Sequence, residues 1–127
     1  MHDRGFPATS RSSELAAGLL DVVNESELED FVGGLVAESA RSTGRRIPGA
    51  AARALVDSLT RTAERTLPTL AVALGDEDRP PAPLAAQTAA RFFGVEPEGM
   101  SAEDRDFEIA RRFVRFAQAE AARVARA

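Results

Sequence analysis

Carboxylates are the most plentiful side chains in this sequence that could do chemistry. Asp76, Glu77 and Asp78 follow one another directly, and a run of carboxylates can bind a divalent cation. The run lacks the ligand spacing and the central glycine of a helix–loop–helix calcium site. A solvated acidic turn is therefore the better interpretation of these three residues.

A second group of carboxylates lies where we predict a helix. Glu103 and Asp106 are three residues apart, and Asp104 and Glu108 are four apart, so each pair shares a helix face. Carboxylate-bridged metal sites in helical proteins normally add histidine, and the single histidine here is His2. We therefore predict no metal ligands, no cofactor-binding residues and no catalytic residues.

Other reactive side chains are missing from the sequence. It contains no Cys, Trp, Tyr or Lys, which excludes thiolate nucleophiles, disulfides, lysine Schiff bases and the lysine-dependent phosphate loop. Its serines and threonines have no histidine or lysine nearby to activate them. The composition leaves enzymatic activity uncertain but leans against it.

Arginine supplies all 16 positive charges, and three arginines gather near the C-terminus. Arg111, Arg112 and Arg115 could hold phosphate or anionic lipid, and Phe116 adds an apolar group beside them. One interpretation is a helix that lies on an anionic membrane surface. The other places the phenylalanines in the core and the arginines in solvent.

The bulk properties bear on partners and location. The net charge of −4 makes nucleic acid an unfavourable partner. The chain has no run of about 18 apolar residues that could span a membrane. Residues 1–13 lack the apolar stretch of a secretory signal. We therefore expect a cytoplasmic location.

Apolar residues recur at helical spacing along most of the chain, and no segment alternates as a strand would. The pattern predicts an all-α fold, a compact bundle of five or six helices with a flexible N-terminal arm. The arm covers residues 1–11, and residues 12–127 form a single helical domain with an acidic, proline-rich internal linker at 76–83. The expected helices start at Ser12 or Ser13, Ser26, Gly49, after Pro68, near Leu84 and at Ser101, and the last ends near Val124.

Capping residues mark several of the expected helix ends. Ser26 and Glu29 have the spacing of a reciprocal capping box, and Ser101 precedes a first turn rich in carboxylates. Asn24 is expected to end the first helix, and Gly44 and Gly94 to end later ones. Pro68 ends or kinks the helix that precedes it.

Gly33 and Gly34 lie inside an expected helix, where each glycine costs about 1 kcal/mol relative to alanine. Two together indicate a neighbouring helix that approaches closely, or a kink. We take both as candidate interaction residues, together with Arg111, Arg112, Arg115 and Phe116.

Charge alternates along the chain in four blocks. Residues 1–39 carry a net charge of −6, residues 40–75 carry +4, residues 76–108 carry −6 and residues 109–127 carry +4. One explanation is that charges complement the helix dipoles on solvated faces. The other is complementary docking, within the fold or between two copies of the chain.

The sequence resembles a group of small bacterial proteins that has no established function. Residues 99–117 resemble the group's C-terminal signature, in which glycine, serine, Glu and Asp precede a helix containing Phe-Glu, Ala-Arg and Phe-Val. Residues 26–35 are similar to its acidic N-terminal helix, and residues 65–68 to its central Leu-Pro corner. The group follows that corner with a glycine-rich apolar stretch, whereas residues 75–83 here are acidic and proline-rich. Because the group has no established activity, cofactor or catalytic residue, the resemblance implies none for this sequence.

Three functional hypotheses follow. The leading one is a non-enzymatic helical interaction or assembly protein that forms a homo-oligomer or docks on a protein partner. The first alternative is a peripheral membrane-surface protein that uses the C-terminal Arg/Phe helix. The second is a small ligand-binding module or enzyme built on carboxylates and arginines.

Overall fold

The computed structural model describes residues 7–74, 81–96 and 98–126, and within them it contains six α-helices and no strand. The helices are α1 (Pro7–Leu20), α2 (Glu25–Ser42), α3 (Gly49–Thr66), α4 (Pro68–Leu74), α5 (Ala82–Phe93) and α6 (Ala102–Arg126). The predicted all-α bundle is confirmed.

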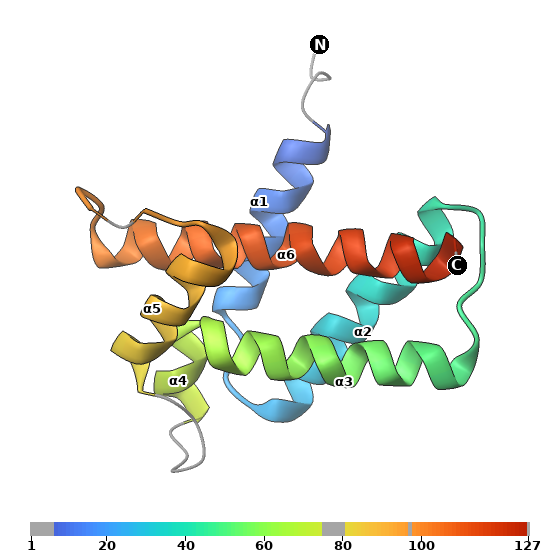
Figure 1. The fold of residues 1–127 in the computed structure, drawn as a ribbon, viewed down its shortest axis with the longest axis horizontal. Coiled ribbons are helices and arrows are strands. Elements are labelled where there is room, and N and C mark those ends of the chain that lie inside the picture. The colour runs from blue at the N-terminus through green and yellow to red at the C-terminus, as the bar shows by residue number, and fades with distance from the viewer. Residues whose placement is uncertain (1–6, 75–80, 97, 127) are drawn as a thin grey trace.

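The longest helix, α6, is the centre of the bundle. It packs against α1, α2, α3 and α5, whereas α4 packs against α3 and α5. In Figure 1, α3 and α6 run antiparallel along the longest axis of the molecule, and α1 crosses behind α6. The α5–α6 loop and the α2–α3 loop therefore lie at opposite ends of the molecule (Figure 1).

The core is built where these helices meet α6. Phe113 is fully buried, and so are Leu28 of α2 and Leu59 of α3. Four alanines of α6 are buried, and their small side chains let the other helices pack closely against it. These four residues are Ala110, Ala117, Ala121 and Ala125.

The first two helices begin at residues other than those predicted. α1 begins at Pro7 rather than at Ser12 or Ser13, so residues 7–11 of the predicted arm are helical, while residues 1–6 lie outside the described residues. Proline suits the first turn because its fixed φ matches the helix and its missing N–H would have no partner there.

The cap of α2 is Asn24, not Ser26. The Asn24 side-chain oxygen accepts from the backbone N–H of Glu27 at 2.8 Å, and the Glu27 carboxylate accepts from the N–H of Val23 at 3.0 Å. A related arrangement therefore stands two residues before the capping box predicted at Ser26 and Glu29, with Glu27 bound to the N–H of the residue before the cap. Asn24 begins a helix rather than ending one.

The two proline-containing junctions differ in how far they match the prediction. Leu67 adopts an extended conformation (φ −100°, ψ 107°), as expected for a residue before proline, so α3 and α4 are separate helices. α5 begins at Ala82, so Pro83, predicted within the linker, occupies the first helical turn. Residues 76–80 of that linker lie outside the described residues.

The remaining caps follow the prediction. Ser101 Oγ accepts from the N–H of Asp104 at 3.1 Å at the start of α6. Gly44 follows α2 with φ +73°, and Gly94 follows α5 with φ +71°, the left-handed conformation that glycine adopts without strain.

Candidate functional site

Two of the three predicted C-terminal interaction arginines, Arg111 and Arg112, form hydrogen bonds and ion pairs within the fold. Glu108 accepts from Arg111 at 2.7 Å and from Arg112 at 2.8 Å, so one carboxylate binds two of the three guanidinium groups. Arg112 also donates to the backbone carbonyl of Phe93 at 2.7 Å. Arg115 is the exposed member of the set, and it has no ion pair within the part of the chain that the structure describes.

Phe116 belongs to an aromatic cluster shared by α5 and α6. Its ring lies edge-on to Phe92, with centroids 5.2 Å apart, and to Phe93, with centroids 6.0 Å apart. Phe92 is 52% exposed, so this ring lies at the surface rather than in the core. The cluster is therefore a partly exposed contact between α5 and α6.

The contacts at this C-terminal surface do not favour a membrane-binding helix. Phe113 is buried in the core, and Arg111 and Arg112 both bind Glu108, so these two arginines share one compensating carboxylate. An amphipathic surface helix needs free cations next to exposed apolar side chains. No helix in the described part of the chain is both long and apolar enough to cross a bilayer.

The candidate carboxylates do not converge. Asp106 pairs with Arg105 at 3.0 Å and Glu108 with the two arginines, while Glu103 and Asp104 face solvent. Among the residues that the structure describes, no three His, Asp or Glu side chains are grouped as metal ligands would be. The Asp76–Asp78 run falls outside those residues.

The two glycines of α2 do not mark a close helix contact. A Cβ atom built on Gly33 or on Gly34 would meet nothing within 4 Å, so no neighbouring helix of this chain requires glycine at either position. The expected close approach is therefore wrong for contacts within the chain. Gly34 is exposed, whereas Gly33 is half-buried and faces a groove.

That groove lies between the C-terminal half of α2 and the N-terminal half of α3, and its volume is about 330 Å³. Its walls carry short side chains where larger ones would fill it: Gly33, Ala37 and Ala40 from α2, and Ala52 from α3. Val36, Ile47 and Val56 form the rest of its apolar surface. The groove is thus a consequence of small residues on two facing helices.

Arginines form the rim of this groove. Arg41 lies in the last turn of α2, and Arg45 and Arg46 lie in the loop that leads to α3; all three are exposed. None has an ion-pair partner among the residues with described side chains, and no carboxylate lines the groove. We call Gly33, Val36, Ala37, Ala40, Ile47, Ala52 and Val56, with these three arginines, the α2–α3 groove.

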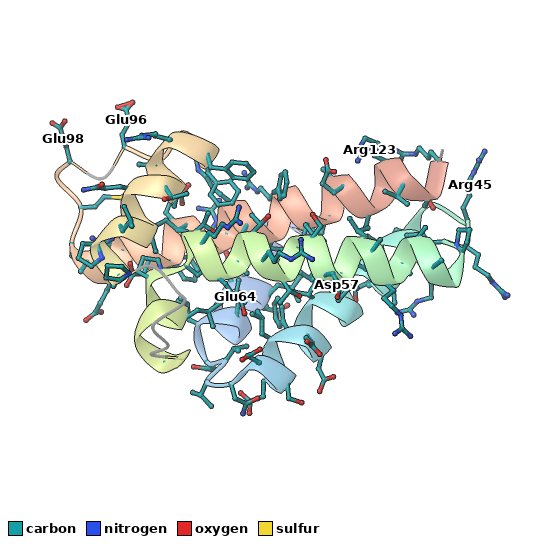
Figure 2. The ribbon with its side chains drawn as sticks, turned by 60° about the horizontal axis from the view of Figure 1, so that its bottom comes forward. Arg45, Asp57, Glu64, Glu96, Glu98 and Arg123 are labelled. Atoms are coloured by element: carbon teal, nitrogen blue, oxygen red, sulfur yellow. The ribbon has the colours of Figure 1, made fainter. Side chains whose placement is uncertain are left out.

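The end of the molecule that holds this groove is basic. Figure 2 shows Arg45 and Arg123 at one end and Glu96 and Glu98 at the opposite end. Arg123 donates to Glu120 at 2.7 Å, and this hydrogen bond raises the pKa of Arg123 above its ordinary value. Labelled residues of the second and third charge blocks, Arg45 on one side and Glu96 and Glu98 on the other, thus lie at opposite ends of the molecule.

Sequence reasoning missed this groove. The available signal was three arginines within six residues, Arg41, Arg45 and Arg46, flanked by two helices with small residues at helical spacing. Of the predicted interaction residues only Gly33 lines the groove.

No family model matches the chain, and neither a curated protein nor a solved structure matches it.

Proposed function

We propose that the protein is a non-enzymatic assembly module whose α2–α3 groove binds an acidic, apolar-tipped segment of a protein partner. The observation that carries this proposal is the pairing of an apolar floor with three arginines that have no described ion-pair partner. The floor favours an apolar side chain, and the rim favours carboxylates beside it.

The size and the open shape of the groove suit a single apolar side chain of a protein segment. Pockets for small molecules usually span about 300–1,000 Å³, and a groove of about 330 Å³ is at the lower limit. It is open to solvent along α2 and α3, so it can take one apolar side chain while the flanking carboxylates stay at the arginine rim. Residue types suited to catalysis do not line it.

The dye 8-anilinonaphthalene-1-sulfonate (ANS) tests the groove, since it combines an apolar ring system with one negative charge. Gly33→Leu places a large apolar side chain at a position that lines the groove, where the added Cβ would meet nothing within 4 Å. Gly34→Leu is the matched control on the neighbouring, exposed position. We expect Gly33→Leu to weaken ANS binding by at least about tenfold, equivalent to about 1.4 kcal/mol, and Gly34→Leu to leave it unchanged.

A competition experiment tests the partner's chemistry. A capped peptide with one leucine between two pairs of glutamates should displace ANS, and the same peptide with lysines should not. Equal displacement by both peptides, or ANS binding that is unaffected by Gly33→Leu, would contradict the proposal.

A further inference from the structure

The end of the molecule opposite the α2–α3 groove has the chemistry that the groove requires. The loop between α5 and α6 protrudes there, as Figure 1 shows, and Glu96 and Glu98 extend from it in Figure 2. Met100 in the same loop is 41% exposed. Glu103 and Asp104, in the first turn of α6, add two exposed carboxylates. We call Glu96, Glu98, Met100, Glu103 and Asp104 the acidic tip.

The acidic tip and the groove are complementary in both charge and polarity. The tip presents one apolar side chain, Met100, between carboxylates on either side in the sequence. The groove presents an apolar floor beside Arg41, Arg45 and Arg46. Methionine is unbranched and flexible, so it fits irregular apolar hollows better than a branched side chain does.

The two surfaces cannot meet within one molecule. Arg45 of the groove rim and the glutamates of the tip lie at opposite ends of the molecule (Figure 2). A tip can therefore occupy a groove only on a second copy. Such a contact uses two different surfaces, so it is heterologous and extends from copy to copy unless the rotation between copies closes a ring.

We propose that the occupant of the α2–α3 groove is the acidic tip of a second copy of this chain, with Met100 inserted between α2 and α3. The inference rests on the proposed function, because it names the partner of the same groove. It also accounts for two of the four charge blocks: the acidic third block supplies the tip, and the basic second block supplies the arginines of the groove rim.

Two variants separate the two halves of this contact. Gly33→Leu fills the groove and keeps the tip. Glu98→Arg with Met100→Ser removes the tip and keeps the groove. Neither change touches a buried side chain, and the far-ultraviolet circular dichroism of each variant should match that of the unchanged chain.

Sedimentation velocity of the full chain at low salt is the test. The unchanged chain should self-associate as its concentration rises, into a closed ring or an open chain of copies, and the Gly34→Leu control should do the same. Each of the two variants should remain monomeric alone. Mixed in equal amounts they should form a dimer and no larger species, because one intact groove and one intact tip remain in each mixed pair. Added salt should weaken this association.

The outcomes separate this inference from the proposed function. A monomeric mixture would overturn the inference, and so would variants that associate alone as the unchanged chain does. Suppose that the association results overturn the inference, but ANS binds the unchanged chain and its binding is lost in Gly33→Leu. The groove then remains a docking site for another protein, and only a second copy of the chain is excluded as its occupant. If Gly33→Leu leaves both ANS binding and self-association unchanged, both proposals fail.

Discussion

Arg112 donates a hydrogen bond to the main-chain carbonyl of Phe93 at 2.7 Å, which joins the end of α5 to the middle of α6. The carbonyl belongs to the last residue of α5, where helical carbonyls lack partners within the helix. Glu108 binds the same guanidinium at 2.8 Å and holds it in position. A residue that the sequence indicated as an interaction candidate therefore has a structural role.

Replacing Glu108 tests this structural role. Glu108→Gln removes the charge that two partly buried guanidinium groups share, so we expect the free energy of unfolding to fall by about 1–3 kcal/mol. Urea denaturation measures it. Glu98→Gln, in the exposed loop, is the control and should change stability by less than about 0.5 kcal/mol. Equal effects of the two substitutions would contradict the role given to Glu108.

The start of α2 offers a second test. Asn24→Ala should cost about 1 kcal/mol, since it removes the side-chain acceptor for the N–H of Glu27. Ser26→Ala should cost much less, because Ser26 lies inside the first turn rather than at the cap. Thermal unfolding of the two variants compares them directly. A larger loss of stability for Ser26→Ala than for Asn24→Ala would instead support the capping box that the sequence pattern indicated at Ser26.

Alanine substitution should raise the stability at the two glycines inside α2 and lower it at the glycine that follows α2. Gly33→Ala and Gly34→Ala should each stabilise the chain by about 0.5–1 kcal/mol, because alanine favours helix and open space surrounds both positions. Gly44→Ala should destabilise it by about 1–2 kcal/mol, since φ is +73° there. Chemical denaturation gives the three values. A loss of stability in Gly33→Ala would mean that a helix approaches closely after all.

Alanine substitutions of the phenylalanines in α5 and α6 should lower the stability by amounts that distinguish a core ring from a surface ring. Phe113→Ala removes a fully buried ring and should cost about 3–5 kcal/mol. Phe92→Ala should cost about 1 kcal/mol, because half of that ring is exposed and its remaining contacts are edge-on aromatic pairs. Comparable losses in urea unfolding would show that the aromatic cluster is part of the core.

Local sequence patterns predicted much of the fold. The apolar spacing of α6, the cap at Ser101 and the glycines at 44 and 94 each act within a few residues, so the sequence contains their signals. The predicted cap of α2 was wrong by two residues, because Asn24 and Ser26 each have a glutamate three residues later. α1 is already helical at Pro7, five residues before the serines that the sequence pattern indicated as caps.

The candidate site could not be predicted in the same way. The α2–α3 groove exists because small residues on two helices face each other, and the pairing of those helices is a tertiary property. The contact between Arg112 and Phe93 likewise joins residues 19 positions apart. The helical periodicity identified the arginines near the C-terminus, but it did not show which of them would form ion pairs within the fold.

Methyl-resolved NMR of the full chain, titrated with the leucine–glutamate peptide, tests the central claim most directly. We predict that the methyl signals of Val36, Ile47 and Val56 shift progressively with peptide concentration, whereas those of Ile109 in the core stay unchanged. The shifts should disappear in Gly33→Leu and persist in Gly34→Leu. Unchanged groove methyls, with shifts confined to residues around Phe92 and Phe116, would contradict the α2–α3 groove as the docking site.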